Sequence, residues 1–452
     1  MTQAGLRAVS QPHRVFLFLQ GPHGPFLRRL AQALHDRGAR VRRINFNAAD
    51  AAEWARGLPS VRFMGPRETY REWLIQQIEA HGVTDIVFYG DTRAVHRIAW
   101  DTARMLGITV HNLEEGYLRP RFVTYERGGA NGFSRAMDIS LPQMAGAVGA
   151  AAPPDEEGQG DSWGDTRQHR WYSFVYYVRL MLSSGGAREH TSNRAMPMWQ
   201  EVGWYMMRAL GQPYIRLWRW WRQSRLRAAD RSYHLVLLQL SFDASMREHS
   251  AYPDTAAFIE EVIDAFAESA PKSHLLVFKA HPFESGRERL GHAIRDIARD
   301  LGVSDRVVFI DGGMRLAGLM NRARSVITVN STGAHQALWR GIPVLACGRA
   351  VYRKPGIVSE QSLQGFFRHP RRPDLRAYWI LRRFLLATSQ FSGSFYAETG
   401  ILRLLRDLPD AMLRAEDSYD IVGVRCGSSG PDADDRRGGS HPQVEILLGE
   451  IR

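Results

Sequence analysis

The chain has little cysteine, no long apolar run and no recognisable secretory leader. Its 452 residues include two cysteines, Cys347 and Cys426, which are too few for a disulfide framework and too far apart for a zinc site. No stretch approaches about 18 consecutive apolar residues, the length needed to span a bilayer. The first residues lack the apolar segment and small-residue cleavage site of a signal peptide. We therefore expect a protein of the reducing cytoplasm without a membrane span.

Several familiar signatures are missing as well. There is no GxxxxGK[ST] loop, no H-E-x-x-H and no cysteine cluster, which argues against P-loop ATPases and common zinc hydrolases. No helix-turn-helix, zinc-finger or RNP signature accompanies the net charge of +12, so nucleic acid is not expected as a partner. The excess of 59 Lys and Arg over 47 Asp and Glu suits a phosphate- or carboxylate-bearing partner, and a solvated basic surface is the alternative.

Apolar segments alternate with helical patterns twice along the chain, over 14–114 and over 234–348. Such alternation predicts parallel sheets with helices on their faces, and the chain is longer than one core usually supports. We expect an N-terminal domain at 1–141, a flexible linker or loop at 142–162, a helical bridge at 163–231, a C-terminal domain with closing helices at 232–420 and a mostly disordered tail at 421–452. The predicted fold class is α/β and GT-B-like, with two Rossmann-type domains facing an interdomain cleft.

The bridge at 163–231 is rich in tryptophan and arginine, as in the run that contains Trp218, Trp220 and Trp221. These residue types together suit an interface that is apolar on one side and lined by anionic phosphates on the other, such as a bilayer surface. The alternative is a helical brace whose aromatic residues pack on the two domains.

Two polar motifs follow predicted strands of the C-terminal domain. One strand ends at Asn330, after which Ser331, Thr332 and Gly333 offer hydroxyls and open backbone for a phosphate, unless they serve as a helix cap. Another motif begins with Lys279, and its Pro282 stops the strand so that His281 projects from the end. We expect His281 to bind or protonate a leaving phosphate, with a purely structural histidine as the alternative.

Carboxylates and glycines at other strand ends complete the candidate site. Glu114 and Glu115 are adjacent, and like charges held close raise one pKa into the acid/base range, unless the pair is merely a solvated surface doublet. Asp243, after the first strand of the C-terminal domain, is a candidate nucleophile for an anomeric carbon, or else a turn cap. Gly21 and Gly24 open a helix whose backbone amides could meet an anionic acceptor.

Several motifs within roughly residues 13–400 resemble the capsule polysaccharide biosynthesis family, in particular its β-Kdo transferases of the KpsS/LipB type. In chain order, these motifs are FLQGPHGPF, EEGYLRPRFVTYERGGANG, QLSFDAS, FKAHPFESG and NSTGAHQALWRGIPVLACG. The resemblance implies a transferase that moves β-linked 3-deoxy-D-manno-octulosonic acid (Kdo) from CMP-Kdo to a phosphatidylglycerol-type lipid. Such a protein would act at the cytoplasmic face of the inner membrane and start the linker of a capsular polysaccharide, with other capsule synthesis and export proteins as possible partners.

The resemblance also implies roles for the candidate residues. His281 and Pro282 would hold the CMP phosphate, Ser331 and Thr332 would bind the same nucleotide, and the Glu114–Glu115 pair would supply the acid/base. Asp243 would be the nucleophile of a retaining double displacement. The sequence departs from the expected pattern in one respect, because Ala280 precedes the histidine where a more basic stretch is expected.

The anionic donor is compatible with catalysis that uses no metal and no cofactor. CMP-Kdo carries a phosphate and a carboxylate, and Lys279, His281 and Arg119 could neutralise this charge in place of Mg²⁺. Two alternatives remain open. The same cleft would suit another nucleotide-sugar transferase such as a sialyltransferase, and a non-catalytic capsule assembly or export factor would use its basic face to bind polymer or partner proteins.

Overall fold

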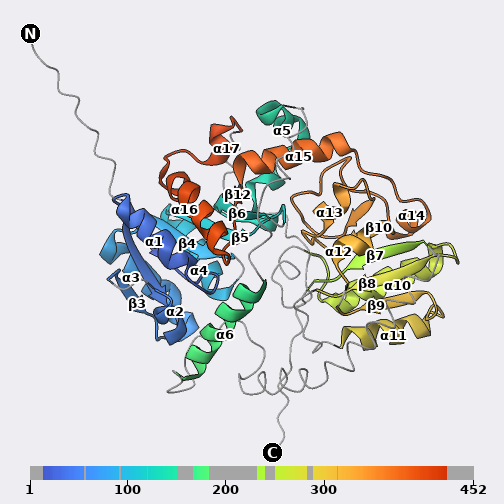
Figure 1. Cartoon of the computed structure of the whole chain (residues 1–452), viewed down its shortest axis with the longest axis horizontal. Coiled ribbons are helices and arrows are strands. Elements are labelled where there is room, and N and C mark those ends of the chain that lie inside the picture. Colours follow the sequence, from blue (N-terminus) through green and yellow to red (C-terminus); the bar gives the residue numbers. More distant parts are fainter. Residues whose placement is uncertain are drawn as a thin grey trace, which may run out of the picture.

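The computed structural model describes residues 14–54, 57–90, 93–119, 121–149, 166–182, 232–239, 250–281, 289–312 and 314–424. Within these ranges the chain forms two sheets with helices on their faces, lying side by side in Figure 1. The N-terminal sheet has the order β12-β6-β5-β4-β1-β2-β3. Its strands are β1 (Val15–Phe18), β2 (Arg40–Asn45), β3 (Ser60–Arg62), β4 (Asp85–Tyr89), β5 (Thr109–Glu115), β6 (Phe122–Arg127) and β12 (Gln390–Ser392).

The N-terminal sheet is buried on both faces. In β1, Phe16 and Phe18 join one apolar core while Val15 and Leu17 join another, as the two-residue period of a strand requires. Helix α1 (Phe26–Asp36) covers the first face, and α3 (Tyr70–His81) and α4 (Ala94–Leu106) cover the second. The strands β1 to β5 pair in parallel, whereas β6 runs antiparallel to β5.

The C-terminal sheet is entirely parallel, with the order β11-β10-β7-β8-β9. Its strands are β7 (Tyr233–Leu237), β8 (Leu275–Lys279), β9 (Val307–Ile310), β10 (Ala323–Thr328) and β11 (Val344–Ala346). The helices α10 (Thr255–Ser269), α11 (Leu290–Asp300), α12 (Leu316–Met320), α13 (Ala334–Leu338) and α14 (Leu363–Arg368) surround it. Two Rossmann-type domains are therefore present, and the predicted fold class is confirmed.

The end of the chain returns to the N-terminal domain. After α15 (Leu375–Thr388), strand β12 pairs antiparallel with β6, and α16 (Glu398–Leu413) packs on α1. Apolar side chains of α16 such as Ile401 and Leu404 belong to the same core as α1. The prediction that 232–420 forms one domain is therefore wrong for 390–420. Burial of the apolar face of α16 against the first sheet is the physical reason.

The segment expected to be a flexible linker begins with an ordered helix, α5 (Leu141–Val148). Ser140 and Gln143 form a capping box at its start, and Met144 is buried in a core to which both domains contribute. Helix α5 lies along α15, as Figure 1 shows. The prediction of a flexible linker is therefore wrong for 142–148, and the remainder, 150–162, lies outside the described residues.

Of the predicted helical bridge, the structure describes α6 (Thr166–Leu182), which packs against α2 (Ala48–Ala52) of the N-terminal domain. The tryptophan-rich run at 183–231 and the tail beyond residue 424 lie outside the described residues. Of the predicted tail, residue 421 ends α17 (Ser418–Ile421) and 422–424 come directly after this helix. Among the helices of the described ranges, none combines the length and apolar composition needed to cross a bilayer.

Candidate functional site

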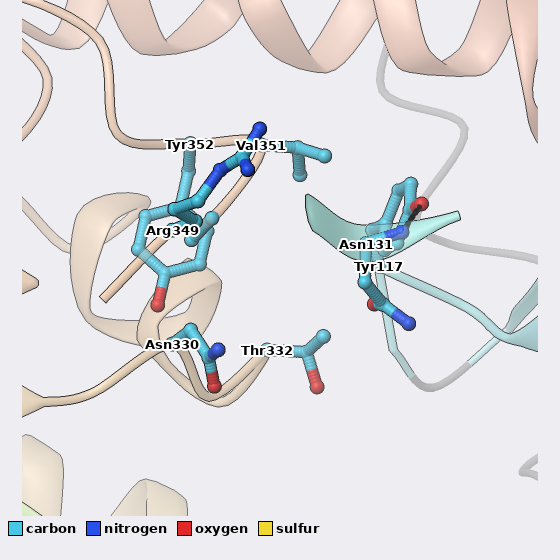
Figure 2. Close-up of a pocket in the computed structure, with 8 residues that line it drawn as sticks. Tyr117, Asn131, Asn330, Thr332, Arg349, Val351 and Tyr352 are labelled. Atoms are coloured by element: carbon cyan, nitrogen blue, oxygen red, sulfur yellow. Dashed lines mark hydrogen bonds between the residues drawn. The ribbon is translucent and has the colours of Figure 1, made fainter. Parts of the chain in front are cut away.

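A pocket lies between the two domains, at the carboxyl ends of the C-terminal strands (Figure 2). The N-terminal domain contributes Tyr117 and Asn131 to its wall, and these face the C-terminal residues across the opening. The C-terminal lining residues are Asn330, Thr332, Arg349, Ala350, Val351 and Tyr352. Open parallel sheets bind ligands at this edge, so the position of the pocket fits the predicted interdomain site.

The loop after β10 is held by hydrogen bonds to its own sheet. The amide of Asn330 donates to Gln239 Oε1 (3.2 Å), and the amide of Ser331 donates to Thr328 Oγ1 (3.3 Å). Ser331 Oγ accepts the amide of Gly333 at 3.2 Å, which forms a local turn, and helix α13 begins after it without a side-chain cap. Thus Asn330 and Thr332 line the pocket while the Ser331 hydroxyl organises the loop.

Tyr352, another residue of the C-terminal wall, braces the same loop. Its hydroxyl donates to the Ser331 carbonyl at 2.9 Å. A Cβ atom on Gly333 would lie within 3.3 Å of both Leu237 and Ser331 Oγ, so the loop can approach the sheet closely because residue 333 is glycine.

The end of β8 places two further predicted residues beside the interdomain boundary. Lys279 follows Val277 on the face that joins the shared core, and it is buried with its Nζ donating to the Ala280 carbonyl at 2.9 Å. His281 comes next. Burial lowers the pKa of His281, and together with the positive charges of Arg119 and Lys279 it brings that pKa to about 4.

The charge of Arg119 acts on His281 although the two residues belong to different domains. The structure therefore brings together three predicted residues, Lys279, His281 and Arg119. His281 is neutral near pH 7 and can donate one N–H. Pro282 lies outside the described residues.

Glu114 and Glu115 are the last residues of β5, where they pair with Thr124 and Val123 of β6. Both carboxylates lie near the same two tyrosines, because the charges of Glu114 and Glu115 each act on Tyr89 and on Tyr396. Glu115 accepts a hydrogen bond from the Tyr89 hydroxyl at 3.3 Å, and its charge acts on Tyr396 and on His169 of α6.

Glu114, like Glu115, lies near the end of β4. A Cβ atom on Gly90 would come within 3.3 Å of Glu114 Oε2. The predicted sharp turn after the pair is present, because a Cβ atom on Gly116 would lie 2.1 Å from the Phe122 carbonyl oxygen. This turn delivers Tyr117 to the pocket two residues after Glu115.

The predicted acceptor-side glycines lie beneath α6. The amide of Gly24 donates to Glu53 Oε1 at 2.9 Å, and a Cβ atom there would meet the Tyr172 ring at 2.8 Å. Gly24 therefore does not offer its amide to an acceptor in this structure, which corrects that expectation. Gly21 is buried where a Cβ atom would overlap Leu27, so its role is close packing and any part in acceptor binding stays a prediction.

The surroundings of Gly24 also hold α6 in place. Burial raises the pKa of Glu53 to about 7, against the lowering effect of its bond from the Gly24 amide. The Tyr176 hydroxyl donates to Asp50 Oδ1 (2.9 Å) and accepts from Asn47 Nδ2 (2.8 Å). Helix α6 is thus fixed to the N-terminal domain by buried polar contacts.

Sequence reasoning missed the N-terminal wall of the pocket and residues 349–352. Asn131 has a φ of 53°, a left-handed conformation that is uncommon for a residue other than glycine. Its place in the run GGAN was a usable signal, and so was the position of 349–352 just after β11. Asp243 lies outside the described residues, and no group of three or more His, Cys, Asp or Glu suited to a metal occurs within the described part of the chain.

Comparison with known proteins gives matches over most of the chain. Residues 84–396 match the family described as capsule polysaccharide biosynthesis protein. The chain is 28% identical over 392 residues to the capsule polysaccharide export protein KpsS of Escherichia coli, covering 84% of this chain and 96% of that protein. It is 28% identical over 388 residues to the capsule polysaccharide modification protein LipB of Neisseria meningitidis serogroup B, covering 84% and 91%.

Solved structures share the general arrangement at low sequence identity. The β-Kdo 2,7 transferase of Thermosulfurimonas dismutans KpsC is 14% identical, with 87% of this chain and 99% of that chain covered and a TM-score of 0.42. Anabaena HepE in complex with UDP and glucose is 13% identical, with 88% and 99% covered and a TM-score of 0.34.

Proposed function

The chain belongs to the capsule polysaccharide biosynthesis family, and from this premise we propose that it is a retaining glycosyltransferase that moves β-Kdo from CMP-Kdo to a phosphatidylglycerol-type lipid. The product would be the first unit of the linker on which a capsular polysaccharide is built. The observation that carries the proposal is the meeting of Arg119 from one domain with Lys279 and His281 from the other, beside a pocket lined by both domains.

These groups suit a leaving phosphate monoester. Lys279 and Arg119 supply positive charge, and neutral His281 supplies an N–H donor to the oxygen that becomes negative as the glycosidic bond breaks. Thr332 and Asn330 add polar groups to the wall of the pocket, where they would contact the rest of the nucleotide. Charge neutralisation by side chains is the basis for proposing that the reaction needs no divalent metal.

The catalytic carboxylates of the proposal have separate tasks. Asp243 attacks the anomeric carbon and CMP leaves; the acceptor oxygen then attacks the same carbon and releases Asp243. We assign Glu115 to take the proton of the acceptor hydroxyl in the second step, because its carboxylate lies on the α6 side of the N-terminal domain. Glu114 remains the alternative base, and comparison of Glu115→Gln with Glu114→Gln separates them.

The acceptor side includes a surface suited to anionic lipid. Helix α6 exposes Trp171 (60%), Phe174 (59%) and Leu182 (84%), and it contains arginines but no acidic residue. Apolar and basic side chains on one helix favour the interfacial region of an anionic bilayer. The opposite face of α6 carries His169, on which the charge of Glu115 acts. Peripheral membrane association is part of the proposal.

Vesicle flotation tests the lipid surface. Trp171→Ser with Phe174→Ser should lower binding to phosphatidylglycerol vesicles at least tenfold, because each exposed aromatic contributes apolar area to the bound state. Leu402→Ser is the matched control, since Leu402 is 57% exposed on a different helix, α16. Equal binding by the double variant and the control would remove α6 from the proposal.

Product analysis tests the reaction. The protein is incubated with a lyso-phosphatidylglycerol analogue and, in separate reactions, with CMP-Kdo, CMP-sialic acid and UDP-sugars, and the lipid is examined by mass spectrometry. Addition of one Kdo from CMP-Kdo is expected. Transfer from CMP-sialic acid instead would establish the sialyltransferase alternative. No transfer from any donor, with capsule production unaffected by His281→Ala, would favour a non-catalytic assembly factor.

A further inference from the structure

A buried carboxylate lies behind the N-terminal wall of the pocket. Glu126, on β6, is 1% exposed and accepts three hydroxyl hydrogen bonds. The donors are Tyr117 (2.8 Å, to Oε1), Ser134 (2.7 Å, to Oε2) and Tyr419 (2.9 Å, to Oε2). These come from the turn after β5, the segment after Asn131 and the C-terminal helix α17, so one side chain joins three distant parts of the N-terminal domain.

The Tyr117 branch leads directly into the pocket. While the Tyr117 hydroxyl donates to Glu126, it accepts the backbone amide of Asn131 at 2.6 Å. Asn131 is the residue with a φ of 53°, and both residues line the pocket on the side opposite Asn330 and Thr332 (Figure 2). A left-handed conformation in a residue other than glycine persists only where surrounding contacts impose it, and such residues cluster at binding sites.

The Ser134 branch reaches the other domain. Ser134 Oγ also accepts the amide of Ala136 (3.1 Å), and the carbonyls of Ala136 and Met137 accept from Lys354 Nζ at 2.8 and 2.7 Å. Lys354 follows the lining residue Tyr352 by two positions. The contacts of Glu126 therefore extend to the C-terminal domain, two residues beyond the pocket wall.

We propose that Glu126 is a positioning residue for the nucleotide pocket: through the Tyr117 hydroxyl it fixes Asn131 in its left-handed conformation, so that the Asn131 side chain meets the bound nucleotide. The inference deepens the proposed function and rests on it for the identity of the ligand. Glu126 itself does not touch the ligand, because the Tyr117 side chain stands between the carboxylate and the pocket.

Two phenylalanine substitutions separate positioning from simple stabilisation. Tyr117→Phe and Tyr419→Phe each remove one buried hydroxyl bonded to Glu126, but only Tyr117 also holds Asn131. Calorimetric titration with CMP is expected to show about tenfold weaker binding for Tyr117→Phe and less than a twofold change for Tyr419→Phe, at similar losses of melting temperature. Equal CMP affinities in the two variants would overturn the proposal.

The hydrogen bonds from Glu126 through the Tyr117 hydroxyl to Asn131 form a relay, and substitutions at its two ends sharpen the test. Glu126→Gln keeps an oxygen that accepts from Tyr117 and should bind CMP within about threefold of wild type, whereas Glu126→Leu should match Tyr117→Phe. Asn131→Gly tolerates the left-handed φ, so Tyr117→Phe should add little further loss of affinity in that background. Full additivity of the two changes would contradict the relay.

The wild-type titration distinguishes the inference from the proposed function. If the wild-type protein binds CMP and Tyr117→Phe binds it equally well, the inference fails while the function stands. If the wild-type protein binds none of CMP, UMP or UDP, both are refuted.

Discussion

The Glu126 carboxyl should make the stability of this protein depend on pH in a way that one isosteric substitution removes. Glu126→Gln retains the shape of the side chain and an acceptor oxygen but cannot ionise. Burial raises the pKa of Glu126 from its ordinary 4.5 to about 7, although hydrogen bonds from Ser134, Tyr117 and Tyr419 act in the opposite direction and Asp417 adds a small further increase. In the unfolded chain the same carboxyl would titrate near its ordinary value.

The direction of the effect follows from proton binding. Between about pH 4.5 and pH 7 the folded protein retains a proton that the unfolded chain has released, so the free energy of unfolding falls as the pH rises through this range. A difference of about 2.5 pH units corresponds to about 3 kcal/mol at 1.36 kcal/mol per unit. This contribution is present in full below the unfolded pKa and is lost by about pH 8.

Urea unfolding of the wild-type protein and of Glu126→Gln at intervals from pH 4.5 to pH 8 measures the effect. Glu53 has a similarly raised pKa and contributes its own slope to both proteins, so the difference between them isolates Glu126. The wild-type protein should lose about 3 kcal/mol relative to Glu126→Gln across this range. A constant difference at every pH would mean that Glu126 ionises with an ordinary pKa, and the reasoning would be refuted.

Three further outcomes are expected. Lys354→Met removes the donor to the Ala136 and Met137 carbonyls and should lower the free energy of unfolding by about 2 kcal/mol. The control Arg349→Met, at an exposed position, should leave the free energy of unfolding within about 0.5 kcal/mol of wild type. Equal effects of the two variants would show that the interdomain hydrogen bonds contribute nothing to stability. His281→Ala should lower kcat/KM for transfer about 100-fold. The control His292→Ala, at an exposed position on α11, should leave kcat/KM unchanged. Similar kcat/KM values for the two variants would remove His281 from the site. Transferase activity should survive EDTA, and complete loss restored by Mg²⁺ would contradict the assignment of charge neutralisation to side chains.

The central strands of both sheets were predictable because apolar residues there are buried on both faces. The strand expected before the Lys279 motif, for example, is β8 over Leu275–Lys279. Strand β6 was missed because its polar residues pair with a partner across a short turn rather than forming an apolar run. Strand β12 was also missed, since its place beside β6 depends on contacts such as Gln390 Nε2 to Thr124 Oγ1 between residues far apart in the chain.

The candidate site was predictable only where strand ends determine it. Lys279 and His281 end one parallel strand, Thr332 follows another, and the topology of the sheet brings such ends together. Tyr117 and Asn131 were not predictable in the same way, because they reach the pocket through a turn and a relay of hydrogen bonds within the N-terminal domain.

The central claim, that a nucleotide is held between the two domains by residues of both, is tested most directly by a crystal structure of the protein with CMP. The account predicts the CMP phosphate within about 3 Å of the His281 ring, close to Lys279 and Arg119, with the nucleoside between Thr332 and Asn131. A CMP molecule bound elsewhere, or one contacted by only one domain, would contradict it.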